Sequence, residues 1–300
     1  MPELPDVTAY VDAIASRVAG QPLQGIRVAS PFVVRTFDPP LAAAAGRPVL
    51  GVQRLGKRIV LALEGGLFLV IHLMIAGRFR WGERGTKIPG KVGLAAFDFP
   101  SGSLLLTEAA TRKRASIHLS RSLDEFRRAG IEPLECTRER FEAALRRENH
   151  TLKRALTDPR LFSGIGNAYS DEILHRAKLS PALLTQKMSA GEVDSLFAAT
   201  RAVLSGWTER LRQEAKGKFP EKVTAFRDDF AVHGKYRKPC PVCGTAVQRI
   251  AYADNETNYC PRCQTGGKLL SDRSLARLLH DDWPRTIEEL EERFPSARTK

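Results

Sequence analysis

No hydrophobic run in this sequence is long enough to cross a membrane. A transmembrane helix needs about 20 consecutive apolar residues, and the apolar stretch 59–73 is interrupted by a glutamate and two glycines. The first residues also lack the apolar core of a secretory signal peptide. These absences exclude the usual membrane and secreted classes. We therefore expect a cytoplasmic protein that has no membrane partner.

Acidic residues are too few to balance the basic ones. The 300 residues include 34 Asp+Glu against 47 Lys+Arg, which gives a net charge of +13 and a pI near 9.8. Such an excess favours a polyanionic partner, with nucleic acid as the first candidate. The length suggests about two domains, and 43% hydrophobic residues are enough for a real core.

Cysteine is also scarce, and four of the five cysteines are confined to one segment. Cys240, Cys243, Cys260 and Cys263 form two CxxC pairs that are separated by sixteen residues. In a reducing compartment this spacing predicts a tetrahedral zinc site, not disulfides. Four sulfur ligands leave no open position, so we predict one structural Zn²⁺ per chain. Cys136 is expected to be a buried or idle thiol.

Internal repeats and low-complexity segments are absent, and the chain changes character near residue 130. Before that point, apolar runs at 59–73 and 93–108 read as hairpins with turns at glycines. After it, four stretches have helical spacing: 137–148, 151–158, 167–177 and 189–207. Strands followed by helices predict an α+β multidomain fold whose first part is an antiparallel sandwich or barrel.

The chain opens with MPELPD, which places two prolines and two carboxylates within six residues. The simplest interpretation is a helix start, because Pro5 suits a first turn and acidic side chains complement the helix dipole. Apolar residues then recur at helical spacing, which predicts a packed helix: they are Val7, Tyr10, Val11, Ile14 and Val18.

A glycine-rich turn, GIGN, precedes the stretch 167–177. Gly164 and Gly166 flank an isoleucine, and the expected helix opens at Asn167. Such a turn aims backbone N–H groups at an anion. A GxG before a helix is a weak signal by itself, but it follows a basic segment containing Lys153 and Arg154. This stretch looks like the hairpin of a helix-two-turn-helix DNA clamp.

Taken together, these motifs resemble the formamidopyrimidine-DNA glycosylase/endonuclease VIII family of base-excision repair enzymes. MPELPD, Lys57 in RLGKRIVL, GIGNAYSDE and the CPVCG…YCPRCQ pair occur in one order over residues 1 to about 264. The resemblance implies an N-terminal β-sandwich with flanking helices, a helix-two-turn-helix domain and a C-terminal zinc finger built as a β-hairpin. The expected divisions, with a helical extension last, are 1–130, 131–222, 223–268 and 269–300.

The resemblance also implies the chemistry. Met1 would be removed, and Pro2 would attack the sugar of a damaged nucleotide through its secondary amine. A terminal amine titrates near 7.7–8.0, so a part of it is neutral and nucleophilic at physiological pH. Glu3 would shuttle protons, and Lys57 would hold a phosphate or donate a proton. The alternative for Lys57 is a solvated strand lysine. Lys153, Gly166 and Asn167 match the family's phosphate clamp.

Several positions depart from the family pattern. The void left by a flipped base is commonly filled by Met, Arg and Phe, and here these positions hold Ile75, Arg112 and Arg114. The zinc-finger hairpin normally carries an arginine where this chain has Asn255. Segment 223–236 is short for the loop that caps an oxidised purine. These departures concern lesion specificity more than activity on an abasic site.

Two classes of function remain open at this stage. The first is a DNA glycosylase with abasic-site lyase activity, acting as a monomer on DNA with damaged bases or abasic sites. The second is a catalytically weak or silent protein that binds damaged DNA with the same clamp. The MPE opening distinguishes them, since a pure binder has no need of it. An RNA-binding zinc-ribbon protein is a weaker third alternative.

Overall fold

The computed structural model describes residues 1–221, 223, 227–252, 255–270 and 284–293. The chain divides into two compact units. Unit 1 comprises Met1–Arg128 and Gly206–Ala225, and unit 2 comprises Ala129–Ser205 and Phe226–Lys300. The four-part division expected from the sequence stays a prediction.

Unit 1 is a sandwich of two antiparallel four-stranded sheets preceded by a helix, α1 (Leu4–Val18). The first sheet has the order β1 (Gly25–Val28), β6 (Gly93–Phe99), β7 (Gly102–Glu108), β5 (Gly77–Gly82). The second has the order β2 (Val49–Leu55), β3 (Arg58–Leu63), β4 (Leu67–His72), β8 (Ser116–Ser120). Short 3₁₀ turns lie at Pro31–Val33, Leu41–Ala44 and Asp124–Phe126. The β-sandwich expected from the sequence is confirmed.

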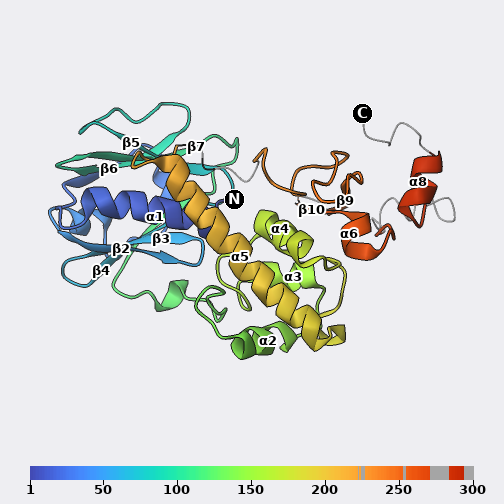
Figure 1. The fold of residues 1–300 in the computed structure, drawn as a ribbon. Helices are drawn as coiled ribbons and strands as arrows, with labels where there is room; N and C mark the ends of the chain where they lie inside the picture. The colour runs from blue at the N-terminus through green and yellow to red at the C-terminus, as the bar shows by residue number, and fades with distance from the viewer. Residues whose placement is uncertain (222, 224–226, 253–254, 271–283, 294–300) are drawn as a thin grey trace. The chain divides into compact units, whose positions relative to one another are not determined.

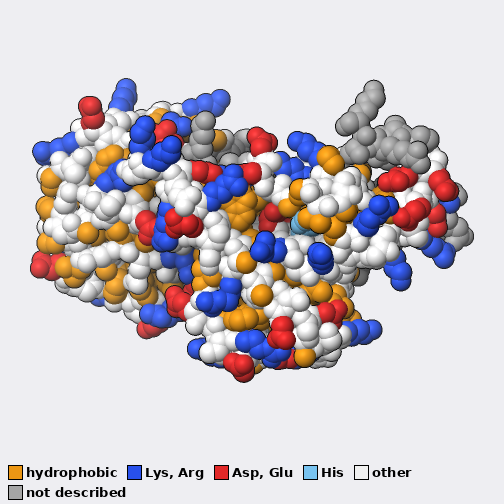
Figure 2. All heavy atoms as spheres, viewed as in Figure 1, with side chains coloured by type: hydrophobic (Ala, Val, Ile, Leu, Met, Phe, Trp, Pro, Cys, Tyr) orange, Lys and Arg blue, Asp and Glu red, His pale blue; other side chains and the backbone are white. Residues whose placement is uncertain are grey.

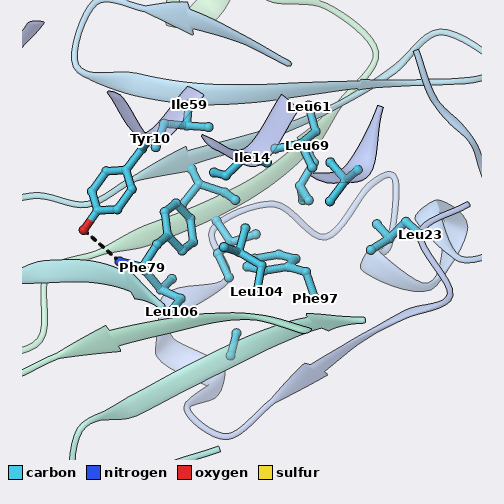
Figure 3. Packing of buried hydrophobic residues seen from close by; sticks show 14 of the residues in the cluster. Tyr10, Ile14, Leu23, Ile59, Leu61, Leu69, Phe79, Phe97, Leu104 and Leu106 are labelled. Carbon is cyan, nitrogen blue, oxygen red and sulfur yellow. Dashed lines mark hydrogen bonds between the residues drawn. The ribbon is translucent and has the colours of Figure 1, made fainter. Parts of the chain in front are cut away.

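The core of unit 1 lies between the two sheets, and α1 contributes one face to it (Figure 3). The Tyr10 ring packs edge-on against Phe79 at 5.7 Å between centroids, and its hydroxyl accepts the Phe79 N–H at 3.3 Å. Burial raises the pKa of Tyr10 well above its usual range. Each fully buried apolar side chain stabilises the unit by about 1.5–3 kcal/mol. The predicted apolar face is confirmed, since Val7, Tyr10, Ile14 and Val18 are fully buried.

Unit 2 combines helices with a small cysteine-bearing module (Figure 1). Its helices are α2 (Arg138–Arg146), α3 (Leu152–Thr157), α4 (Asn167–Ala177), the part of α5 (Ala190–Ala215) before Gly206, α6 (Pro261–Thr265) and α8 (Ile287–Arg293). A 3₁₀ turn lies at Thr185–Lys187, and β9 (Gln248–Tyr252) pairs with β10 (Asn255–Tyr259) as an antiparallel hairpin. The hairpin predicted between the two CxxC pairs is therefore confirmed.

Two helix starts are closed by polar side chains. Ser189 and Glu192 form a capping box: the Ser189 N–H donates to the Glu192 carboxylate at 2.8 Å, and the Glu192 N–H donates to the Ser189 hydroxyl at 3.3 Å. Thr286 likewise accepts the Glu289 N–H at 3.3 Å. Sequence periodicity ended the helix after Trp207, whereas α5 continues to Ala215. Of the helical extension expected at 269–300, the structure describes residues 269–270 and 284–293, which include α8.

Among the described residues, no helix combines the length and the apolar character that a membrane span requires.

Candidate active site and nucleic-acid interface

Three connections leave the sandwich of unit 1 at the same end. His72, the last residue of β4, pairs with both Arg58 of β3 and Ser116 of β8. Gly77, the first residue of β5, pairs with Glu108, the last residue of β7. Because paired strand ends lie side by side, the β2–β3 turn, the β4–β5 turn and the β7–β8 loop emerge together.

These connections carry four of the residues singled out from the sequence. Lys57 lies in the β2–β3 turn, not in a strand, and is half-buried. Ile75 lies in the β4–β5 turn and is 52% exposed. Arg112 and Arg114 lie in the β7–β8 loop, and both are exposed. The topology therefore gathers these four side chains at one edge of unit 1, although they are far apart in sequence.

The N-terminal residues are packed, not frayed. Pro2 is buried, and Glu3 is only 2% exposed at the N-cap of α1. The Glu3 N–H donates to the Asp6 carboxylate at 2.9 Å, and the Glu3 carboxylate accepts the backbone N–H of Asp6. This capping box, with Pro5 in the first turn, confirms the helix-start interpretation of MPELPD. The same contacts hold the start of the chain in one position.

The environment of the terminal amine favours its neutral form. In the structure the amine belongs to Met1, and its pKa is lowered from the ordinary value of 8.0, chiefly by burial. The carboxylate of Glu3 opposes this effect, while the charges of Arg78 and Lys57 reinforce it. An amine that loses its proton more readily is a better nucleophile at neutral pH. Lys57, Glu3 and the chain start thus form one electrostatic cluster.

Arg78 is a member of this cluster that sequence reasoning missed. It is the second residue of β5, and its guanidinium donates to the carbonyl oxygens of Ile75 at 3.2 Å and Gly77 at 2.6 Å. The alternating pattern of a strand marks Arg78 only as an outward-facing residue. Its proximity to the amine depends on the register of β5, which no local pattern encodes.

His72 adds to the same end of the sandwich. Its side chain is half-buried. Burial lowers the pKa of His72 to about 4, and the charges of Arg58, Lys57 and His118 act in the same direction. The imidazole is therefore neutral at physiological pH.

A buried carboxylate holds the β7–β8 loop. Glu108 is 1% exposed, and its carboxylate accepts the backbone N–H of Arg114 at 2.9 Å and of Ala115 at 3.1 Å. The Lys113 ammonium donates to the backbone carbonyl of the same glutamate. These bonds anchor both ends of the turn that presents Arg112. Loops that carry function are commonly held by such a rigid scaffold.

We predict that Glu108→Ala will destabilise unit 1 by about 1–3 kcal/mol, because two backbone N–H groups lose their acceptor. Urea unfolding followed by fluorescence measures the free energy of unfolding, and hydrogen exchange should quicken in residues 109–115. Glu83→Ala is the matched control, since that exposed side chain should cost less than about 0.5 kcal/mol. Equal stability of both variants would contradict the anchoring role.

In unit 2, the start of α4 gathers the residues expected to clamp a phosphate. Gly164 adopts a positive φ of 81°, and Gly166 is the N-cap, so the chain turns sharply into Asn167. The Lys153 ammonium donates to the Asn167 carbonyl at 2.7 Å and pairs with the Asp171 carboxylate at 2.5 Å. The structure therefore brings Lys153 and Asn167 together, and it adds a carboxylate partner that the sequence did not suggest.

Asp171 and its neighbour Glu172 connect α4 to the rest of unit 2. Asp171 is fully buried. Besides the Lys153 ammonium, its carboxylate accepts the Asn258 N–H at 3.1 Å and contacts the His233 Nδ1 at 2.8 Å. Glu172 accepts three backbone N–H groups, those of Ala231, Val232 and His233, at 2.8–2.9 Å. Sequence reasoning missed both carboxylates, because two acidic residues in an amphipathic helix do not indicate which groups they will bind.

The four cysteines of the two CxxC pairs converge, as the spacing predicts. Their sulfur atoms all lie within 4.8 Å of one another, with 3.4 Å between Cys243 and Cys260 and 3.9 Å between Cys240 and Cys263. Zn–S bonds of about 2.3 Å in a tetrahedron place sulfurs about 3.8 Å apart. The donor set fits zinc.

The remaining predicted positions have simpler outcomes. Cys136 is buried and lies outside the cysteine cluster, as expected. Asn255 pairs with Tyr252 in the β9–β10 hairpin, but its side chain lies outside the described part of the chain. On the face seen in Figure 2, Lys and Arg side chains are spread over both units with Asp and Glu among them. On this face the basic side chains therefore do not gather into a single patch.

Models of protein families match most of the chain. The formamidopyrimidine-DNA glycosylase N-terminal domain matches residues 1–165, and the H2TH domain of the same enzyme matches residues 130–214. A zinc finger found in FPG and IleRS matches residues 237–266.

Individual relatives are similar over most of their length. The formamidopyrimidine-DNA glycosylase of Solibacter usitatus is 31% identical over 280 residues, which cover 88% of this chain and 99% of that protein. The corresponding protein of Thermus thermophilus is 33% identical over 276 residues, covering 89% of this chain and 100% of that protein.

Solved structures give the same result. Lactococcus lactis FPG, in a complex with DNA containing Fapy-dG, aligns with a TM-score of 0.77 and 25% identity over 88% of this chain and 100% of that chain. The MutM (FPG) protein of Thermus thermophilus aligns with a TM-score of 0.75 and 32% identity over 88% of this chain and 98% of that chain. The fold and the order of its parts are shared.

Proposed function

Because the chain belongs to the formamidopyrimidine-DNA glycosylase family, we propose that it excises oxidised bases from DNA and then cleaves the strand at the abasic site. One observation carries the proposal: the buried start of the chain lies in one electrostatic cluster with Glu3 and Lys57. A nucleophilic amine, a carboxylate and a cation are the groups that this reaction needs.

Pro2 is the proposed nucleophile after removal of Met1. Its secondary amine, in the neutral form, forms a bond to the sugar C1′ as the bond between C1′ and the base breaks. The base leaves with the bonding electrons and takes up a proton, and the amine gives up its own proton. The C1′–O4′ bond of the sugar ring then breaks, O4′ takes up a proton, and the nitrogen lone pair completes the iminium. The iminium acidifies the adjacent C2′ hydrogens, so the 3′ phosphate is expelled by elimination.

Glu3 is the proposed proton shuttle. Its carboxylate lies next to Pro2 in sequence and is buried, so it is held beside the reacting sugar. General acid–base catalysis by such a group contributes typically about 10²–10⁴-fold. Because its carboxylate also accepts the Asp6 N–H, the hydrogen bond that starts α1 also orients the proton carrier.

The proposed DNA contacts come from both units. In unit 1, Lys57 holds a phosphate near the lesion, and the side chains of Ile75, Arg112 and Arg114 are the candidates for filling the void in the duplex. In unit 2, the proposed clamp is formed by Lys153, Gly166 and Asn167 at the start of α4, with Asn255 at the zinc-finger hairpin. One Zn²⁺ per chain, held by the cysteine quartet, supplies the structural stability of that module.

The second candidate is a catalytically weak or silent protein that binds damaged DNA. One observation favours it: the capping box at Glu3 and Asp6 explains the MPELPD motif by helix formation alone. The distinction is covalent chemistry at Pro2, which a binder lacks.

We propose that the protein acts as a monomer. We also propose that it lies in the cytoplasm, associated with the nucleoid, because its DNA substrate is there.

Lesion preference follows from the departures in the void-filling positions. Unstacking a base costs a few kcal/mol unless something fills the gap, and a base–aromatic stack contributes about 1–3 kcal/mol. Arg114 replaces the usual aromatic residue, and segment 223–236 is short for a loop that encloses a purine. We therefore propose that abasic sites and destabilised lesions are better substrates than 8-oxoguanine paired with cytosine, with oxidised pyrimidines as the preferred intact bases.

The test uses purified protein and a panel of oligonucleotides with oxidised bases or an abasic site, scored for strand cleavage. Arg114→Phe should raise cleavage of fully paired lesions severalfold, because about 1 kcal/mol of stacking corresponds to a factor of about five. Cleavage at abasic sites should change little. Arg121→Phe, which lies beyond β8 and is exposed, is the control. Efficient excision of 8-oxoguanine by the unmodified protein would refute the proposed preference.

A further inference from the structure

One histidine of unit 2 contacts the cysteine cluster without belonging to either CxxC pair. The Nε2 of His175 lies 3.2 Å from the Cys240 sulfur, and the two residues are 6% and 2% exposed. His175 is in the last turn of α4, 65 positions before that cysteine. Nothing in the spacing of the motifs indicates this contact.

When the cluster holds a metal, the hydrogen bond between His175 and Cys240 can have only one donor. A metal-bound cysteine is a thiolate, which accepts hydrogen bonds and has no proton to donate. The His175 Nε2 must therefore carry the hydrogen and donate it to the sulfur. Such a bond is charge-assisted and lies in a buried site, where it is stronger than in water.

The same face of α4 already binds the module through other side chains. Glu172 accepts the backbone N–H groups of residues 231–233, and Asp171 accepts the N–H of Asn258 in β10. His175 follows Asp171 by four positions, so the two side chains lie on one side of the helix. The imidazole thus adds a link that reaches a metal-binding sulfur directly, whereas the carboxylates reach backbone N–H groups and the side chains of Asn258 and His233.

We propose that His175 is a positioning residue for the zinc site: its Nε2–H hydrogen bond orients the Cys240 thiolate and ties the cysteine module to α4. The inference rests on the proposed zinc site and extends it. Partners of this kind orient metal ligands, and their loss typically lowers metal affinity by about 10–100-fold. The proposed hydrogen bond also anchors α4, and the first turn of α4 carries the proposed phosphate clamp.

Two substitutions separate the hydrogen bond from simple packing. His175→Phe keeps an aromatic ring in the buried space and removes the donor. His175→Gln has an amide N–H that can reach toward the position of Nε2. His118→Phe is the matched control, because that histidine packs against Phe126 in unit 1 and is remote in sequence from the cysteines.

The experiment measures zinc release from the full-length, zinc-loaded proteins to a chromogenic chelator. His175→Phe should release zinc at least about tenfold faster than the unmodified protein, while His175→Gln and His118→Phe should stay close to it. Alkylation of Cys240 by iodoacetamide, located by mass spectrometry, should also quicken in His175→Phe, because the thiolate loses its donor.

Several outcomes would overturn the proposal. Equal release rates for all proteins would remove the role of His175 while leaving the zinc site intact. Equally fast release from His175→Phe and His175→Gln would assign the effect to packing. Replacing zinc by Co²⁺ makes the metal coordination visible in the ligand-field bands. If the bands of the His175→Phe protein are those of a site that lacks one ligand, His175 is itself a metal ligand and not a positioning residue. Absence of zinc from the unmodified protein would overturn both this inference and the proposed zinc site.

Discussion

Borohydride will trap a covalent adduct between the protein and an oligonucleotide that contains an abasic site, and the adduct will be at Pro2. The expectation follows from the burial of the chain start: burial lowers the pKa of the Met1 amine, and Pro2, which carries the terminal amine once Met1 is removed, is itself buried. Mass spectrometry of the mature protein should show Met1 missing. A variant with an N-terminal extension that is not cleaved keeps Met1, so its Pro2 nitrogen remains part of an amide bond. This variant should give no adduct. Pro2→Gly should be trapped more weakly.

The pH dependence of trapping provides a second measurement on the same amine. An ordinary terminal amine of pKa about 8 is about one-tenth neutral at pH 7. Burial disfavours the charged form, so the neutral fraction at pH 7 should be larger here. The rate of the amine's attack should therefore rise with pH through a midpoint below 8 and then level off. A midpoint above 8 would contradict the inferred environment.

Failure of trapping has a defined meaning only if DNA binding is measured in parallel. If protein that lacks Met1 binds abasic DNA but forms no adduct, the enzymatic proposal fails and the damaged-DNA-binding alternative takes its place. If it neither binds nor reacts, both proposals fail. Fluorescence anisotropy with the same oligonucleotide provides the binding measurement.

Cys260→Ser is expected to abolish stoichiometric zinc and to unfold the cysteine module. Among the described residues the apolar cluster of the module is small, with Val232, Val247, Ala231 and the four cysteines, so the metal is expected to supply a large share of its stability. Metal binding contributes about 10–16 kcal/mol to the folding of isolated zinc-finger peptides. With three ligands, most of that free energy is lost, whereas the sandwich of unit 1 has its own core.

Elemental analysis of protein purified without chelators measures the zinc, and hydrogen exchange in residues 237–266 measures the unfolding. Protection of strands in unit 1 should be unchanged, and affinity for abasic DNA should fall. Cys136→Ser is the control, since Cys136 is a buried thiol outside the cluster. Unmodified protein that lacks zinc, or a Cys260→Ser protein that keeps one zinc per chain, would refute the prediction.

Much of the fold could be predicted from the sequence because its signals are local. The apolar spacing of Tyr10 and Ile14 specifies a helix face, and the glycines between 59–63 and 67–72 specify a hairpin. Ser189 and Glu192 mark a helix start. The spacing of the cysteines predicts their convergence, since each CxxC pair can supply two ligands to one tetrahedral ion. The end of helix α5 was predicted too early, at Trp207 instead of Ala215, because the apolar periodicity fades in the polar segment 208–215.

The candidate site shows the same difference between local sequence patterns and contacts made in the folded chain. The candidate residues could be picked out from the sequence alone, because the MPE start, Lys57, GIGN and the cysteine pairs each form a pattern within a few neighbouring residues. Only the tertiary structure decided what those residues touch. Strand register brings Arg78 to the terminal amine, and the packing of α4 gives Lys153 a carboxylate partner in Asp171. It also gives the cysteine cluster a donor in His175. Periodicity encodes which face a residue occupies, whereas contacts across strands and helices depend on register and packing, which are properties of the whole chain.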